Sequence, residues 1–296
     1  MNRKCYLIFV LVLIPFLLLF SGLQGNNISV NYDYLTGQNT TDGYTYIQFD
    51  ICWENSWRRD NQNQNDYGAP YNWDAAWVFV KYRVNNASLN PESWKHASLS
   101  ATQSEHNYPA DALVKPASDH TGVFIYSNNN QVGDVNYDDI QLRWEYADDG
   151  VSDNDEVEIK VFAIEMVYIP EGSFYVGNDG NEVDKFTKTE ITSASMAPSG
   201  KNIGASFPNG YNALYMMKYE VTQEQYADFL NSLISTEATS RYSASSSGNR
   251  YGITESGGVY STTNRNVACN FISDPDAQAY AAFAGLRPMT EMEYEK

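Results

Sequence analysis

The pattern of hydrophobic and polar positions divides the chain into two regions. From residue 28 to about residue 163, apolar and polar residues alternate, which is typical of β-strands with one buried face. The clearest alternating runs are residues 47–54, 140–146 and 157–161. Residues 76–82 and 123–126 are more continuously apolar and are expected to be central strands of a sheet. Because turns rich in Asn, Asp and Gly separate these runs, the pattern predicts an antiparallel β-sandwich.

Helical periodicity begins in the second region. Thr222 and Gln225 are spaced as a capping box, and Val221 and Tyr226 occupy the positions of a hydrophobic staple. The following apolar residues share one helical face: Tyr226, Phe229, Leu230 and Leu233. The sequence therefore predicts a helix over residues 223–233.

A second helix is predicted over residues 275–284. Asp274 is the expected N-cap, Pro275 suits the first helical position, and Gly285 suits the position after the last turn. The expected buried stripe consists of Ala277, Tyr280, Ala281 and Ala284. Between the two helices, residues 235–266 are rich in Ser, Thr, Gly and Asn, and they predict at most a short hairpin formed by residues 251–254 and 259–262.

A third helix start is found at the end of the chain. Thr290 and Glu293 form a capping box, with Met289 and Tyr294 at the staple positions. Fewer than two turns follow before Lys296, which is too short for a stable helix on its own. We therefore expect the chain to be a fragment of a longer protein.

The N-terminus has the layout of a signal peptide, which we assign to residues 1–25. Arg3 and Lys4 precede an apolar run over residues 5–20, and small residues follow up to Gly25. The alternative is a membrane anchor, but sixteen residues fall short of the roughly 20 that a spanning helix needs. We expect cleavage after Gly25, a secreted or periplasmic protein, and no membrane attachment of the mature chain.

The net charge bears on the possible binding partners, and the cysteines bear on the possible disulfides. The 37 acidic and 19 basic residues give a net charge of −18, which disfavours nucleic acid and anionic lipid as partners. Once Cys5 has left with the signal peptide, Cys52 and Cys269 remain, one in each region, and we expect no disulfide between them.

Three segments of the second region resemble the formylglycine-generating enzyme (sulfatase-modifying factor) family. They are MVYIPEGSFYVG at residues 166–177, YMMKYEVTQEQYADFLN at residues 215–231 and DAQAYAAFAGLRPMTEMEYEK at residues 276–296. Phe283 and Tyr294 replace tryptophans that are usual in the family, and Pro288-Met289 replaces Leu-Pro. The resemblance places a boundary before Ile164, with a β-sandwich domain of unknown function at 26–163 and the N-terminal portion of a sulfatase-modifying-factor-like domain at 164–296.

The resemblance implies a fold and a chemistry. The expected fold class is α+β overall, with the β-sandwich followed by a partial C-type-lectin-like fold. The best-known family members oxidise a cysteine of a sulfatase to formylglycine, using oxygen and a copper ion held by two cysteines, with calcium nearby. The family's copper and calcium ligands are expected beyond Lys296. We therefore assign no catalytic, cofactor-binding or metal-ligating residue within this chain.

Several residue types nevertheless invite a functional interpretation. Cys269 is a possible copper ligand, but no second Cys lies near it, and a buried structural thiol is the preferred interpretation. His96, His106 and His120 match no metal-site spacing. The acidic residues of segment 148–156 could gather around calcium, but they lack the order of an EF-hand and suit a solvated turn.

All six tryptophans lie in the first region. Aromatic faces can stack on sugars, so a carbohydrate-binding module is one hypothesis, and a sandwich core rich in aromatic residues is the other. Trp57 and Trp73, which flank a polar loop, are the strongest sugar-stacking candidates.

Two functions are therefore open. The intact protein is either a metal-dependent enzyme that oxidises a protein cysteine or a related thiol, or a non-catalytic, lectin-like binding or surface protein. The expected partner is a protein or peptide substrate, or a glycan.

Overall fold

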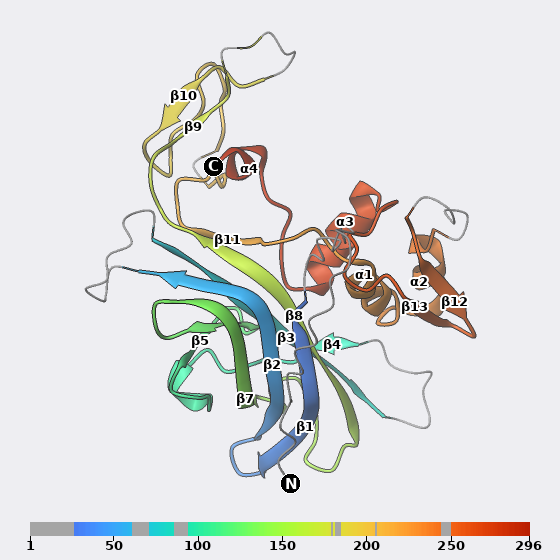
Figure 1. Cartoon of the computed structure of the whole chain (residues 1–296). Helices are drawn as coiled ribbons and strands as arrows, with labels where there is room; N and C mark the ends of the chain where they lie inside the picture. The colour runs from blue at the N-terminus through green and yellow to red at the C-terminus, as the bar shows by residue number, and fades with distance from the viewer. Residues whose placement is uncertain are drawn as a thin grey trace, which may run out of the picture.

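The computed structural model describes residues 27–60, 71–85, 94–178, 180, 185–204, 206–243 and 250–296. The signal peptide predicted for residues 1–25 lies outside these ranges. The described chain is mostly antiparallel β-sheet with few helices, so the predicted α+β class is confirmed (Figure 1).

Nine strands are hydrogen-bonded into one folded sheet. One part of it contains β1 (Ser29–Asn39), β2 (Tyr44–Arg59) and β7 (Gln131–Trp144), with β2 in the middle. The other part contains β3 (Asn72–Val84), β4 (Lys95–His96), β5 (Ala112–Pro116), β6 (Val123–Ser127), β8 (Val157–Ile169) and β11 (Leu214–Met217). The two parts connect where the end of β2 pairs with the start of β3.

The predicted alternation produces a first hydrophobic core. The buried side chains of β2 and β7 include Ile47, Phe49, Ile51, Trp53, Ile140, Leu142 and Trp144. The even-numbered residues of β3 that pack against them are Ala76, Val78, Val80 and Tyr82. The predicted strands over residues 47–54, 76–82, 123–126 and 157–161 are all present, and the strand predicted over residues 140–146 ends at Trp144.

The opposite face of β3 belongs to a second core. Trp77 and Phe79 pack there with Ile164 and Met166 of β8 and with side chains from the helices. Residues 74–82 of β3 are therefore buried on both faces, which explains why residues 76–82 show no alternation.

Four α-helices are described. They are α1 (Gln223–Leu230), α2 (Ser235–Arg241), α3 (Asp274–Phe283) and α4 (Glu291–Glu295). The capping boxes predicted for α1 and α4 are present, and α1 ends three residues before the predicted end. Helix α2 was not expected from the sequence. Its Ser- and Thr-containing sequence has weak helical propensity and buries only Ala238.

The predicted details of α3 and α4 need three corrections. The N-cap of α3 is Ser273 and not Asp274, because the Ser273 hydroxyl accepts the backbone N–H of Asp276 in a capping box. Ala277 is exposed, while Phe283 packs into the second core. Met289 and Tyr294 are both largely exposed, so the staple predicted for α4 does not form a buried contact.

The remaining elements are short. They are the 3₁₀ turn η1 (Gln103–Glu105) and the strands β9 (Phe174–Val176), β10 (Thr189–Ile191), β12 (Ile253–Ser256) and β13 (Val259–Thr262). The pair β12 and β13 confirms the predicted hairpin, with Gly257 and Gly258 in the turn at positive φ.

The predicted boundary before Ile164 falls inside β8. This strand pairs with β3 from Trp73↔Tyr168 to Val84↔Val157, without interruption at residue 164. The same strand pairs at its end with β11. The two regions of the chain therefore share one strand and one sheet, and the division into domains at residue 163 stays a prediction.

Candidate functional site, a groove between the sheet and the helices

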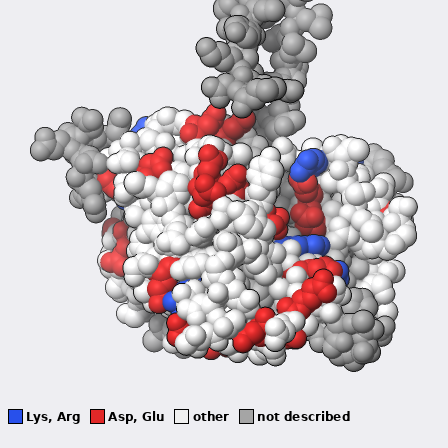
Figure 2. Space-filling view, turned by 90° about the horizontal axis from the view of Figure 1, so that it is seen from below, with Lys and Arg blue, Asp and Glu red and all other residues white. Residues whose placement is uncertain are grey.

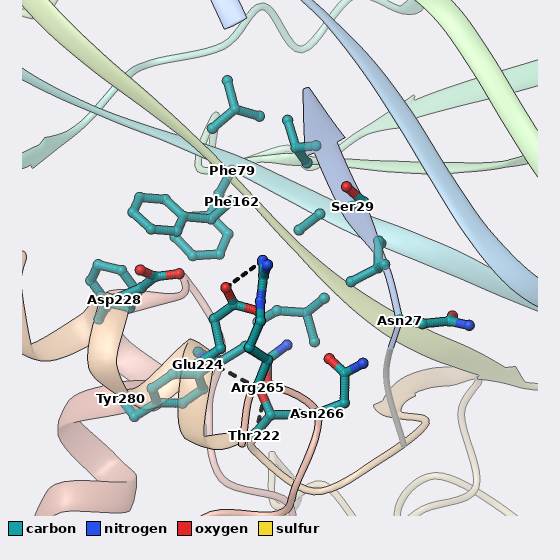
Figure 3. Close-up of a pocket in the computed structure, with 17 residues that line it drawn as sticks. Asn27, Ser29, Phe79, Phe162, Thr222, Glu224, Asp228, Arg265, Asn266 and Tyr280 are labelled. Carbon is teal, nitrogen blue, oxygen red and sulfur yellow. Dashed lines mark hydrogen bonds and ion pairs between the residues drawn. The ribbon is translucent and has the colours of Figure 1, made fainter. Parts of the chain in front are cut away.

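A groove with a volume of about 420 Å³ lies where β1, β3 and β8 meet α1 and α3 (Figure 3). Its lining includes residues 27–30 at the start of β1, Phe79, residues 161–164, residues of α1 and its N-cap, and Arg265 and Asn266. Tyr280 and Phe283 of α3 complete it. Both regions of the chain are therefore needed to form the groove.

Aromatic side chains form one wall of the groove. Phe79 and Phe162 are direct cross-strand partners, and their rings stack with centroids 5.2 Å apart. The ring of Phe283 meets both edge-on, at 5.4 Å from Phe79 and 5.2 Å from Phe162. Paired strands bring such rings together, and the apolar stripe of α3 covers them.

Helix α1 places two carboxylates along the groove. Glu224 and Asp228 are four residues apart and so lie on the same side of the helix. Glu224 is paired with Arg265 at 2.6 Å. The backbone N–H of Glu224 also donates to the carbonyl of Arg265, which fixes the loop that carries the arginine against the start of α1.

Asp228 has no hydrogen bond or ion pair through its side chain within the described residues. Figure 3 shows its carboxylate beside the aromatic side chains of the groove. Burial by the surrounding protein raises the pKa of Asp228 to about 6, and the charge of Glu224 adds to this, while Lys160 and Arg265 oppose it. The residue as a whole remains exposed at the edge of the groove, so a ligand can reach it.

The capping box of α1 fixes the angle at which the helix meets the groove. The Thr222 hydroxyl accepts the backbone N–H of Gln225 at 3.2 Å, and the Gln225 side-chain oxygen accepts the backbone N–H of Thr222 at 3.0 Å. The Gln225 Nε2 is buried and finds no partner in the described part of the chain. An unpaired donor and an unpaired carboxylate thus line the same groove.

The two cysteines have the properties of structural thiols. Cys269 is partly buried against the second core, and burial raises its pKa to about 12, so its thiol stays protonated near neutral pH. Burial also raises the pKa of Cys52, and both cysteines are free. A protonated thiol is a poor copper ligand.

The three histidines occupy separate structural positions. His106 is buried, its Nδ1 accepts the backbone N–H of Arg143 at 3.1 Å, and its Nε2 lies 2.9 Å from the Ser100 carbonyl oxygen. His120 contacts the carbonyl of Leu99 through Nδ1. His96 lies beside Lys81 under α3, and burial lowers its pKa to about 4.

The acidic segment 148–156 forms hydrogen-bonded turns. Asp149 accepts hydrogen bonds from Ser98 and from the Trp144 indole, Asp153 accepts one from the Tyr146 hydroxyl, and Asp155 accepts one from a backbone N–H. Within the described residues, no group of three or more His, Cys, Asp or Glu side chains is arranged to hold a metal ion. The described residues therefore do not fit the copper or calcium sites that the family resemblance implies.

The tryptophans divide into core residues and residues with partly accessible rings. Trp53, Trp77 and Trp144 are buried. The ring of Trp73 stacks on Tyr168 with centroids 3.9 Å apart, and its indole donates to the Tyr215 hydroxyl. The Trp57 indole donates to Asn72, and the ammonium of Lys218 lies 5.2 Å from its ring centroid. Both sugar-stacking candidates therefore make contacts within the protein.

A buried ionic cluster, which the sequence did not reveal, connects the two regions beneath Trp57. Lys218 lies 2.8 Å from Glu165 and 3.1 Å from Asp74, and both carboxylates are almost completely buried. Asp74 also accepts hydrogen bonds from the Trp53 indole and the Ser56 hydroxyl. Its three charged members lie far apart in the sequence, so no local pattern could have indicated it.

By its fold, the chain is an α+β protein in which a strand-rich region and a region of capped helices share one sheet. Residues 153–296 match a family described as the sulfatase-modifying factor enzyme 1-like domain. This match confirms the resemblance seen in the sequence. The matched segment begins eleven residues before Ile164 and therefore includes all of β8. No curated protein and no solved structure matches the chain.

One further observation concerns membranes. Within the described ranges, no helix combines the length and the apolar character that crossing a membrane requires.

Proposed function

We propose that this is an exported protein whose sulfatase-modifying-factor-like region, together with the preceding strands, binds a ligand non-covalently in the groove below α1. One observation supports this most directly: the groove combines an aromatic wall with an unpaired carboxylate at Asp228. Ligand sites commonly have this composition, with apolar walls and a few polar groups that orient the ligand. The partner is a protein or peptide, or a glycan.

For the overall architecture, we propose the fold that the sequence patterns and the family resemblance predict. The strands of the first core form a β-sandwich, and the second region adopts a C-type-lectin-like fold that shares β8 with it. The proposed export rests on the basic start, the apolar run and the small residues of segment 1–25. N-terminal sequencing of the exported protein should find a mature chain that begins near Asn26, and a product that retains Met1 in the membrane would contradict export.

The family match supports a second candidate function. In this candidate, the same region would take part in metal-dependent oxidation of a protein cysteine or a related thiol. The copper and calcium ligands for this chemistry would be supplied outside the described residues. Carbohydrate binding by the strand-rich region, through Trp57 and Trp73, is a variant of the binding function.

Two assays on the purified 296-residue chain test the binding function and its carbohydrate variant, and ask whether this chain has oxidase activity of its own. Binding of immobilised glycans and short peptides is measured for the native chain and for a Phe162→Ala variant, because Phe162 contributes to the wall of the groove. Turnover of a Cys-x-Pro-x-Arg peptide is measured with copper and oxygen. Binding that Phe162→Ala weakens, without turnover, is the expected result. Turnover would favour the enzyme, and binding that only Trp57→Ala weakens would favour the carbohydrate variant.

A further inference from the structure

We propose that the groove recognises an organic cation, the ammonium of a lysine or the guanidinium of an arginine in a peptide, between the Asp228 carboxylate and the rings of Phe162, Tyr280 and Phe283. This inference rests on the proposed binding function and adds the chemical class of the ligand. The inference depends on two observations. The other charged groups around the groove have partners, and the carboxylate of Asp228 has none within the described residues.

The first step concerns the charged groups that face Asp228. On its own helix, Glu224 is neutralised by Arg265. On β8, the ammonium of Lys160 lies over the Trp94 ring at 4.6 Å from its centroid and forms no ion pair with Asp228. On α3, Tyr280 is buried, and burial together with the Asp228 charge raises its pKa, so it stays neutral. Asp228 is therefore the carboxylate available to a ligand.

The second step concerns the aromatic wall. Ring faces carry negative electrostatic potential and attract ammonium and guanidinium groups, more strongly where water is partly excluded. The rings of Phe162 and Phe283 lie 5.2 Å apart, and Tyr280 is 6.1 Å from Phe283. A carboxylate beside several rings provides both contacts that an organic cation uses, whereas a hydrated metal ion would gain little from the rings.

The third step concerns the field of the whole molecule. The net charge of −18 attracts cations over long range. Figure 2 shows that carboxylates cover much more of the face seen from below than basic side chains do. An anionic ligand would be repelled both by Asp228 and by the negative net charge of the molecule, so a cation is the favoured occupant.

The size of the groove is consistent with one side chain and its flanking peptide groups. Its volume of about 420 Å³ lies within the range of roughly 300 to 1,000 Å³ that small ligands occupy. An extended peptide could place one lysine or arginine here while its backbone follows the edge of β1.

The test uses the isotope-labelled protein and three amino-acid probes whose amino and carboxyl groups are capped, so that only the side chain can carry a charge. Nα-acetyl-lysine amide, Nα-acetyl-arginine amide and the neutral Nα-acetyl-norleucine amide are titrated while NMR follows the amides of α1 and β8. We expect the two cationic probes to shift these signals with dissociation constants of about 1 mM or lower, and the neutral probe to bind at least about tenfold more weakly.

Three variants identify the group responsible. Asp228→Asn should weaken the cationic probes about tenfold, because it keeps the shape and removes the charge. Lys160→Gln should strengthen them, because it removes the competing positive charge. Glu237→Gln on α2 removes an exposed charge outside the groove and should change nothing. Binding of the native chain should also weaken as pH falls through about 6, where Asp228 becomes protonated.

The outcomes separate this inference from the proposed function. If all three probes bind equally and Asp228→Asn has no effect, the cation proposal is wrong while ligand binding in the groove stands. If none of the probes shifts the groove signals but the Phe162-dependent glycan or peptide binding is observed, the cation proposal is again wrong. If neither experiment detects binding at the groove, both proposals fail.

Discussion

The two faces of β3 are buried against very different partners. The even-numbered face meets β2 and β7, and its core is built from aliphatic and aromatic side chains between residues 28 and 163. The odd-numbered face meets α1 and α3, and it carries aromatic rings together with Lys81, which is only 5% exposed. One face of β3 thus belongs to a largely apolar core with the buried Asp74 near its start, and the other belongs to a mixed core that contains aromatic rings and Lys81. The groove opens on this mixed side.

The largest expected effect comes from the ionic cluster that links the two regions at the even-numbered face of β3, where Asp74 and Glu165 lie. Lys218→Met would leave Asp74 and Glu165 buried without their cation, which should destabilise the protein by about 3 to 5 kcal/mol. Urea denaturation of both proteins measures the difference. The matched control is Arg83→Met, which breaks an exposed ion pair with Glu158 and should cost no more than about 1 kcal/mol. Equal losses would show that the cluster contributes no more than a surface pair.

The next largest effect compares the two cores directly. Ile125→Ala in the first core and Ile164→Ala in the second remove the same atoms from almost fully buried positions. Each should cost about 2 to 5 kcal/mol. Since β3 and β8 belong to both cores, both variants should shift one common unfolding transition, measured by tryptophan fluorescence and far-UV circular dichroism. Two separated transitions, each sensitive to one variant, would mean that the cores unfold independently.

A pH effect should come from the basic groups on the mixed face. Burial lowers the pKa of Lys81 to about 8, from 10.5 in an exposed lysine. At Lys81, the unfolded chain therefore binds more protons than the native chain between pH 8 and 10.5, and the contribution of Lys81 to stability should rise with pH in this window. Cys269, whose pKa burial raises to about 12, acts in the opposite direction above pH 9. The contribution of Lys81 is up to about 3 kcal/mol.

Lys81→Met should remove this rise in stability, as measured by urea denaturation across the same pH range. His96 acts in the same direction between pH 4 and 6.5, because burial also lowers its pKa. The same pH dependence in the native chain and in Lys81→Met between pH 8 and 10.5 would show that Lys81 remains well hydrated.

The smallest predicted effect concerns the helix that borders the groove. Thr222→Ala removes the hydroxyl that accepts the Gln225 backbone N–H and should cost about 1 kcal/mol. Thr222→Ser keeps the hydroxyl and is the matched control. Thermal denaturation distinguishes them, and an unchanged midpoint for Thr222→Ala would mean that packing alone fixes the start of α1.

Local patterns in the sequence were sufficient for much of the fold. The strands of the first core are recognisable because each carries its own alternation, and the starts of α1 and α4 are recognisable because a capping box lies within four residues. The N-cap of α3 was misplaced by one residue because Ser273, Asp274 and Asp276 are all good caps. Short strands such as β4 and β11 are stabilised by pairing with β3 and β8, and they are too short to show a recognisable alternation in the sequence.

The groove could not be predicted in the same way. Its walls come from residues near positions 28, 79, 162, 225 and 280, which are brought together only by the shared sheet. Asp228 looks like an ordinary polar residue on the solvent side of an amphipathic helix. Its distinctive property, a carboxylate without a partner beside aromatic rings, depends on β8 and α3 and appears only in three dimensions.

The central claim is that the strands and the capped helices form one structural unit, since the groove has no complete wall without both. Native-state hydrogen exchange tests this claim most directly, by comparing the amides of β2 and β7 with those of α1 and α3. Our account predicts that the slowest amides of both groups exchange with the same free energy of opening, and that Lys218→Met lowers both together. Slow exchange in β2 and β7 combined with rapid exchange throughout α1 and α3 would contradict it.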